Sequence, residues 1–186
     1  MTKVIFVPGN GHSTTHDNWF PNVKASLEKN GLEVIAAKFP DGNLARESYW
    51  IPFLRDELKA DCDTILVGHS SGAIAALRFA EQYPLLGSIL VGAYHTDLGI
   101  ESEKLAGYFS RPWAWNKIRE NQKFITIFAS QDDPWIPIDE PRALHSYLNC
   151  EYHEYKNQGH FGGDYFKPDF PELTLSILHN IKKRSN

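Results

Sequence analysis

Gly68-His69-Ser70-Ser71-Gly72, near the middle of the chain, is the stretch that decides the fold. It matches the pattern G-x-S-x-G, and its flanks have the composition that this pattern needs. Residues 64–67 are β-branched and apolar and predict a buried strand, whereas residues 73–81 are rich in helix formers. A strand, a glycine-bounded turn and a helix are the context in which the central serine becomes a nucleophile. We therefore interpret Ser70 as a candidate nucleophile; a plain helix start capped by Ser70 or Ser71 is the alternative.

The composition indicates one globular domain over residues 1–186. The chain is 42% hydrophobic and 23% charged, with a net charge of −4. This balance gives no basic surface for nucleic acid or an anionic membrane. No apolar run reaches the ~18 residues of a membrane span, and no signal peptide precedes the first strand. Cys62 and Cys150 are interpreted as free thiols without metal-ligand spacing. We expect a cytoplasmic protein that needs no metal or cofactor and binds neither nucleic acid nor membrane.

Short apolar runs alternate with amphipathic segments along the whole chain. Strands are predicted at residues 3–7, 33–38, 63–67, 87–93, 123–129 and 150–155. Helices are predicted at residues 17–30, 46–60, 72–82, 103–109, 113–120, 139–148 and 170–183. Such alternation is typical of βαβ units and of a parallel sheet with helices on both faces.

The segment 94–120 is longer than one crossover helix requires. Its aromatic residues are Tyr94, Tyr108, Phe109, Trp113 and Trp115. We predict a cap-like helical insertion over the carboxyl edge of the sheet, where open α/β sheets bind ligands. If Trp113 or Trp115 lines the cleft, the cap limits substrates to short acyl chains. The alternative is a long crossover whose aromatic residues belong to the core.

A serine hydroxyl becomes a nucleophile only with a base to take its proton and an acid to orient the base. In α/β-hydrolases these partners follow in the order Ser, Asp or Glu, His. Here the predicted strand 123–129 leads into Asp132-Asp133-Pro134, and the strand 150–155 leads into Gly159-His160. Asp133 stands in the Asp-x-x-hydrophobic-Pro register that is typical of the acid. We predict Asp133 as the acid and His160 as the base.

Other acids and histidines fit less well. Asp132 is the nearest alternative acid, and we expect it to hydrogen-bond the backbone of its own turn; Asp97 is a third candidate. His69 is expected to pack against the sheet, and His95 lies near the cap, where it could touch substrate. Surface or core positions account for the remaining histidines, His12, His16, His145, His153 and His179.

The oxyanion that forms during acyl transfer needs two hydrogen-bond donors. One is expected to be the backbone N–H of Ser71, the residue after the nucleophile. The second is assigned to the backbone N–H of Asn10, in the Val7–Gly11 loop after the first strand. A phosphate cradle is the alternative for this loop, but it lacks the further glycine or lysine of a nucleotide fingerprint.

These motifs resemble the small serine hydrolases typified by retinoblastoma-binding protein 9, within the α/β-hydrolase superfamily. The similar stretches are residues 7–11 with 14–16, 45–48, 68–76, 110–115, 132–134 and 159–161. The resemblance implies an α/β-hydrolase fold with a six-stranded parallel doubly wound sheet in the order 2-1-3-4-5-6. It also implies a triad of Ser70, Asp133 and His160. The Leu-x-Cys-x-Glu motif associated with retinoblastoma-protein binding is absent, so we do not expect that partner.

The sequence thus predicts a carboxylesterase-like serine hydrolase that cleaves a small ester, or alternatively an amide, through an acyl-enzyme intermediate. Two alternatives remain open. The chain could be a non-catalytic binding or scaffold protein on a hydrolase fold, although three triad residues in register argue against this. It could also be an acyltransferase, because the same triad can pass the acyl group to an acceptor other than water.

Overall fold

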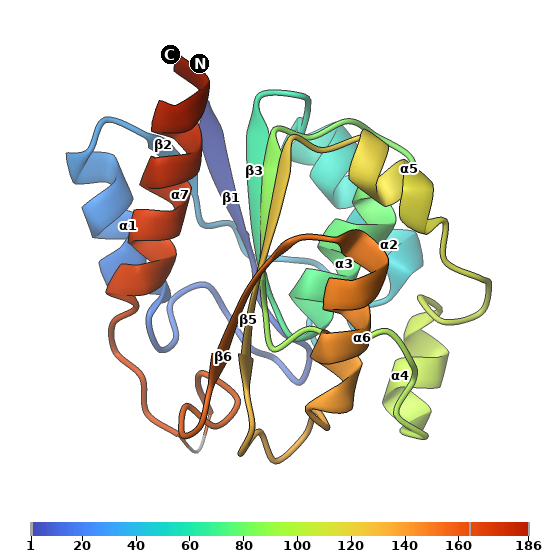
Figure 1. The fold of residues 1–186 in the computed structure, drawn as a ribbon. Helices are drawn as coiled ribbons and strands as arrows, with labels where there is room; N and C mark the ends of the chain where they lie inside the picture. The colour runs from blue at the N-terminus through green and yellow to red at the C-terminus, as the bar shows by residue number, and fades with distance from the viewer. Residues whose placement is uncertain (1, 164, 186) are drawn as a thin grey trace.

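The computed structural model describes residues 2–163 and 165–185, and these residues form a six-stranded parallel sheet (Figure 1). The strands are β1 (Lys3–Val7), β2 (Glu33–Ile35), β3 (Thr64–His69), β4 (Gly87–Val91), β5 (Phe124–Ser130) and β6 (Glu151–Tyr155). Their order is β2-β1-β3-β4-β5-β6, and every neighbouring pair is parallel. This confirms the predicted α/β-hydrolase sheet.

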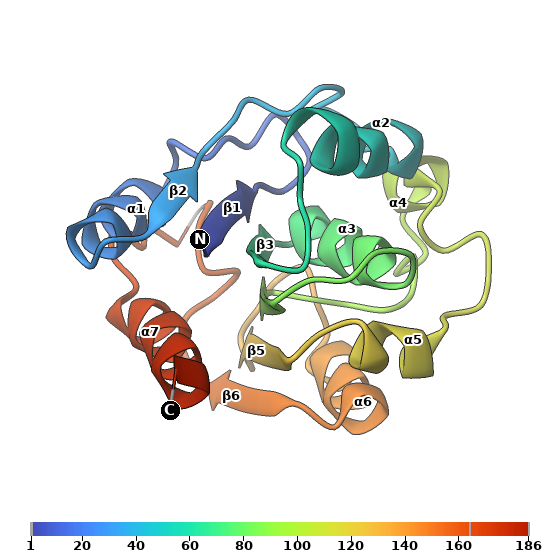
Figure 2. The same cartoon turned by 90° about the horizontal axis from the view of Figure 1, so that it is seen from above.

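Helices cover both faces of the sheet (Figure 2). On one face lie α1 (Phe20–Lys29) and α7 (Pro171–Ser185), and on the other lie α2 (Glu47–Pro52), α3 (Ser71–Ala80), α5 (Trp115–Glu120) and α6 (Asp139–Leu148). The short helix α4 (Glu101–Ala106) lies at the periphery of the second side. The cap-like segment thus contributes α4 and α5, and the carboxyl ends of the strands stay free for a site.

The central strands are apolar because helices cover them on both faces. In β3, Ile65 and Val67 belong to the apolar cluster under α1 and α7, whereas Leu66 belongs to the cluster around α3. This alternation follows from the two-residue period of a strand. The core is therefore two layers separated by the sheet, and β3 delivers its last residue, His69, to the edge where both layers end.

Several predicted boundaries are wrong. Strand β2 covers three residues instead of 33–38. The predicted helix 46–60 is α2 followed by a π-helical turn, η1 (Phe53–Glu57), in which the Leu58 N–H donates to the Phe53 carbonyl. Pro52 at the junction has no N–H, which interrupts the regular helical ladder there. Helix α4 ends at Ala106 because Gly107 takes a left-handed conformation with φ of 87°.

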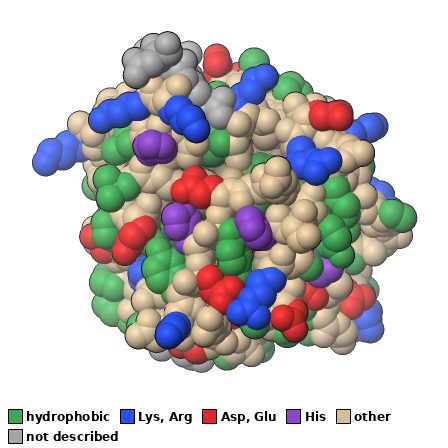
Figure 3. All heavy atoms as spheres, viewed as in Figure 1, with side chains coloured by type: hydrophobic (Ala, Val, Ile, Leu, Met, Phe, Trp, Pro, Cys, Tyr) green, Lys and Arg blue, Asp and Glu red, His purple; other side chains and the backbone are tan. Residues whose placement is uncertain are grey.

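Charges of both signs are interspersed over the face shown in Figure 3. This distribution agrees with the modest net charge of the chain. Among the described residues, no helix has the length and apolar character needed to cross a bilayer.

The first turn of α3 packs directly against the ends of β1 and β3. A Cβ atom on Gly72 would lie 2.2 Å from the Val7 carbonyl oxygen, and one on Gly68 would lie 2.3 Å from the Gly72 carbonyl oxygen. Both distances are far below van der Waals contact, and the atoms they meet are backbone. Only glycine fits at these two positions, so both glycines of the G-x-S-x-G motif are required by the fold.

We expect Gly72→Ala to lower the free energy of unfolding by about 3 kcal/mol or more, because the new methyl group displaces backbone of β1. Gly42→Ala is the matched control, since its Cβ would meet only the His12 Cα at 4.0 Å. Urea titrations of both variants measure the difference. Equal unfolding midpoints for the two variants would contradict the packing described here.

Candidate active site

Ser70 occupies the turn between β3 and α3. Its backbone has φ of 55° and ψ of −123°, a conformation that costs energy for any residue with a side chain. The turn is held from both sides, because the Ser70 N–H donates to the Val91 carbonyl of β4 and the Ser70 carbonyl accepts from Ala73 at the start of α3. This strained turn is the geometry expected of a nucleophile elbow.

Asp133 lies in the loop after β5, with a side chain that is 3% exposed. Its Oδ1 accepts hydrogen bonds from the backbone N–H groups of Trp135 and Ile136, at 2.9 and 3.0 Å. Its Oδ2 lies 2.7 Å from Nδ1 of His160. The backbone donors hold the carboxylate plane, so that one oxygen is free to orient the imidazole.

His160 reaches the site on the loop after β6. Because an ionised carboxylate can only accept, Nδ1 of His160 is assigned as the donor to Asp133, and in the neutral imidazole Nε2 is then the nitrogen that can take a proton. The ring lies close over the end of β4, since a Cβ on Gly92 would be 3.1 Å from His160 Cε1. His160 and Ser70 line the same cavity. The structure thus brings together the three residues predicted from the sequence.

The expectation that Asp132 hydrogen-bonds its own turn is incomplete, because Asp132 also bonds the loop that carries His160. Its Oδ1 accepts from the Ser130 hydroxyl at 2.6 Å and from the Gly159 N–H at 2.9 Å. The Ser130 hydroxyl oxygen in turn accepts from the Gln158 N–H. The bond from Ser130 lowers the pKa of Asp132 despite some burial, and the Gly159 bond acts in the same direction. Asp132 therefore fastens the loop that carries His160 to the end of β5.

His69 supports the same loop from below. Its Nε2 lies 2.7 Å from the His160 carbonyl oxygen, and its ring packs against Trp19 and Phe20. Burial lowers the pKa of His69 to about 3, and the nearby His160 acts in the same direction. The ring is therefore neutral at pH 7, with its proton on Nε2, where it donates to the carbonyl. The expectation that His69 packs rather than reacts agrees with this placement.

The cavity beside Ser70 has a volume of about 700 Å³. The lining residues from the loop after β1 are mostly polar: Asn10, Ser13, Thr14, His16, Asp17 and Asn18. Apolar lining comes from Leu98, Ile100, Trp135 and Ile136. The loop after β1 passes against Ser70, since a Cβ on Gly9 would lie 3.4 Å from the Ser70 Cβ. Asn10 and Ser71 thus flank Ser70, where the second and first oxyanion donors are predicted.

Of the five aromatic residues of the cap, Tyr94 lines this cavity, whereas Tyr108, Phe109, Trp113 and Trp115 do not. Trp113 lies over the guanidinium of Arg78, whose Cζ is 3.5 Å from the ring centroid, and Trp113 stacks on Trp115. The cap residues that do line the cavity are Tyr94, Leu98, Ile100, Ser102 and Glu103. Neither Trp113 nor Trp115 lines the cleft, so the condition under which they would limit acyl length is not met. Trp113 instead attaches the cap to Arg78 of α3.

Arg78 is a buried anchor that the sequence did not single out. It donates to the carbonyls of Tyr108, Arg111 and Pro112, and it pairs with Glu81 at 2.7 Å. Burial lowers the pKa of Arg78, and the Glu81 carboxylate opposes this change. In the sequence, Arg78 lies within the run of helix-forming residues 73–81, and no local pattern distinguishes it from a surface arginine.

Two other candidates lie away from the nucleophile. Asp97, the third candidate acid, accepts from the Gly99 N–H within its own turn. His95 does not line the cavity of Ser70; its Nδ1 lies 2.7 Å from Glu140, and its backbone N–H donates to the same carboxylate. Among the residues that the structure describes, no group of three His, Cys, Asp or Glu side chains is placed to hold a metal ion.

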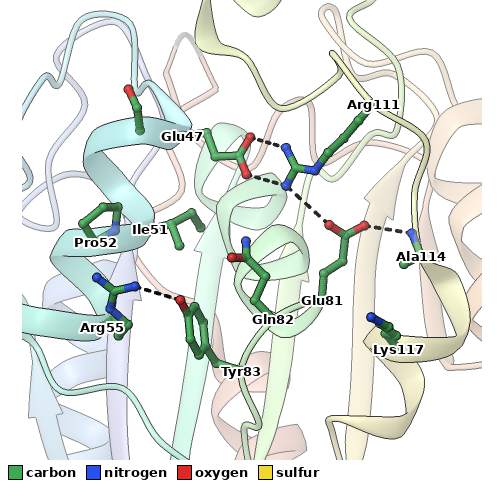
Figure 4. A pocket seen from close by; sticks show the side chains of 11 residues that line it. Glu47, Ile51, Pro52, Arg55, Glu81, Gln82, Tyr83, Arg111, Ala114 and Lys117 are labelled. Carbon is green, nitrogen blue, oxygen red and sulfur yellow. Dashed lines mark hydrogen bonds and ion pairs between the residues drawn. The ribbon is translucent and has the colours of Figure 1, made fainter.

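A second cavity, of about 580 Å³, opens between α2, the end of α3 and the segment before α5 (Figure 4). Its charged side chains face one another across the opening. Arg111 pairs with Glu47 at 2.6 Å and with Glu81 at 3.5 Å, and Glu81 also accepts from the Ala114 N–H. These pairs tie the cap to α2 and α3, which explains the polar lining without a ligand.

The serine hydrolase family model matches residues 4–174. Serine hydrolase RBBP9 of Rattus norvegicus is 45% identical over 163 residues, which are 86% of this chain and 87% of that protein. The chain belongs to the serine hydrolase family. This membership confirms the resemblance to small serine hydrolases of the retinoblastoma-binding protein 9 type.

Solved structures agree with this assignment. The ydeN gene product of Bacillus subtilis superposes with a TM-score of 0.87 at 25% identity, covering 97% of this chain and all of that chain. Est1E from Butyrivibrio proteoclasticus, solved with ferulic acid bound, superposes with a TM-score of 0.73 at 13% identity and covers 97% of this chain and 90% of its own. The second likeness is one of fold alone.

The neutral state of His69 gives the stability a pH dependence. An unfolded histidine has a pKa near 6.5, so between about pH 6.5 and 3 the unfolded chain binds a proton that folded His69 does not. Folding loses stability as the pH falls through this window, by roughly 3–5 kcal/mol from this group. We expect His69→Gln, whose amide can donate to the His160 carbonyl, to lose less stability over that window. Urea titrations at pH 7 and 4.5 compare the two proteins, and equal losses would contradict the assignment.

Proposed function

We propose that this serine hydrolase is carboxylesterase-like and cleaves a small ester, or an amide of similar size, through an acyl-enzyme intermediate. One observation carries the proposal. The 2.7 Å contact between His160 Nδ1 and Asp133 Oδ2 orients the imidazole beside the cavity that contains Ser70. A cavity of about 700 Å³ with polar and apolar walls supports a small-molecule substrate.

In the proposed reaction, Nε2 of His160 takes the hydroxyl proton of Ser70 as its Oγ attacks the substrate carbonyl carbon. The backbone N–H groups of Asn10 and Ser71 donate to the oxyanion of the tetrahedral intermediate. The bond to the leaving group then breaks, and His160 gives that group its proton. A water molecule, deprotonated by His160, attacks the carbonyl carbon of the acyl-Ser70 ester. The bond to Ser70 Oγ then breaks, His160 returns the proton to Oγ, and the acid is released. Throughout, the charge of Asp133 stabilises the imidazolium.

The nucleophile is tested by Ser70→Ala, which we expect to abolish labelling by a fluorophosphonate probe and hydrolysis of a p-nitrophenyl ester while the fold survives. Ser71→Ala retains its backbone N–H but loses its side-chain bond to Tyr94, so we expect labelling to persist and activity to fall by about tenfold. Labelling and initial rates are measured together with circular dichroism. An active Ser70 variant beside an inactive Ser71 variant would refute the choice of nucleophile.

The acid is tested by a matched pair of amide variants. Asp133→Asn disturbs the protonation and orientation of His160, and we expect turnover to fall on the order of 10⁴-fold, as in other triads. Asp132→Asn retains an Oδ1 that can accept from Ser130 and Gly159, so we expect turnover within about threefold of the unmodified protein. Steady-state kinetics decide between them. A collapse in the Asp132 variant with normal turnover in the Asp133 variant would reverse the assignment.

A further inference from the structure

Glu103 is a buried carboxylate of the cap that lines the cavity of Ser70. It lies on α4 and is 6% exposed. Its Oε1 accepts from the side-chain amide of Asn10 at 2.8 Å, and its Oε2 accepts from the hydroxyl of Tyr94 at 2.6 Å. Neither the family resemblance nor the proposed triad accounts for a buried acid at this place.

Tyr94 extends this network to the nucleophile turn. Its hydroxyl oxygen lies 3.2 Å from Oγ of Ser71, and its side chain is buried. Because the single hydroxyl proton of Tyr94 is directed to Glu103, the Ser71 hydroxyl donates to Tyr94. One continuous chain of hydrogen bonds therefore runs from Asn10 through Glu103 and Tyr94 to Ser71.

The two ends of this chain are the two residues assigned as oxyanion donors. They stand on separate loops, after β1 and after β3, and the bonds of the network are made by side chains, which leaves the backbone N–H groups for substrate. We propose that Glu103 is a positioning residue: it sets the spacing of the Asn10 and Ser71 backbone N–H donors by joining their side chains through Tyr94. This inference rests on the proposed function and adds the group that holds its oxyanion site together.

The burial of Glu103 and its hydrogen bonds act on its charge in opposite directions. The carboxyl accepts two hydrogen bonds, and these favour the ionised form. Burial raises the pKa of Glu103, whereas the bonds from Tyr94 and Asn10 lower it. The ionised form therefore depends on both partners, and removing the carboxylate leaves two buried donors without an acceptor.

The test begins with Glu103→Leu, which keeps most of the side-chain volume and removes both acceptors. Losing an oxyanion donor outright costs about 10²–10³ in kcat. For donors that are only displaced we expect kcat to fall about 10–100-fold, with KM changed less than about threefold. Glu103→Gln is the conservative variant, since its amide can accept from Tyr94 and donate to a flipped Asn10 amide. We expect it to recover kcat to within about threefold of the unmodified protein.

Glu101→Gln, on the same helix with a side chain that is 78% exposed, is the control and should behave as the unmodified protein. Tyr94→Phe removes only the hydroxyl, and we expect its kcat to fall about tenfold. This variant also tests the network if Glu103→Leu fails to fold. Because both changes break one network, we expect the double variant to be no slower than Glu103→Leu alone. A kcat loss that Gln does not rescue, additive losses, or a raised KM with normal kcat would overturn the proposal.

A boronic acid that mimics the tetrahedral intermediate gives a second readout. Its affinity should fall with kcat across the variants, since it occupies the oxyanion site, and unchanged affinity would contradict the positioning role. The Ser70→Ala variant separates the two levels of inference. If ester hydrolysis survives in Ser70→Ala, the proposed function and this inference both fail. If Ser70→Ala is inactive and Glu103→Leu keeps normal kcat, only the role of Glu103 is refuted.

Discussion

The close approach of the first turn of α3 to β1 and β3 is the constraint on which the site depends. With no side chain at Gly68 or Gly72, the helix begins within contact of the Val7 carbonyl, and the chain must reverse in a single residue. That residue is Ser70, with φ of 55°. A strained conformation persists only where its surroundings over-determine it, and here the bond to Val91 and the first turn of α3 do so. The position of Ser70 at the wall of the cavity follows from the packing of backbone against backbone.

The partners of Ser70 are held by contacts of a different kind. The loop that carries His160 is held at three places. The His160 carbonyl accepts a hydrogen bond from neutral His69, and the His160 ring lies against Gly92. The Gly159 N–H donates to Asp132. Each of these contacts joins residues from separate strands at the carboxyl edge of the sheet. In the proposed reaction, preorganisation of this kind would lower the cost of reaching the transition state, because the groups need no rearrangement.

The fold and the core of the site could be predicted because their signals are local. The G-x-S-x-G turn, the register of Asp133 before Pro134 and the glycine before His160 each lie within a few residues of one another. Glu103 and Arg78 could not be found in this way, since their roles depend on distant partners: Asn10 lies 93 residues from Glu103, and the Tyr108 and Arg111 carbonyls lie 30 and 33 residues from Arg78. An acidic residue in the first turn of a helix is usual near the positive end of the helix dipole, so nothing in the sequence sets Glu103 apart.

Two buried charged side chains attach the cap to the rest of the protein. At one end Glu103 of the cap binds Asn10 in the loop after β1, and it also binds Tyr94 within the cap. At the other end Arg78 of α3 binds three carbonyls of residues 108–112. Removing one partner of a buried charge costs about 3–5 kcal/mol, so a cap that lifted away would break contacts worth a large part of the stability of a domain. These contacts favour a cap that stays in place. In the proposed function, the residues that line the cavity beside Ser70 would then select among substrates.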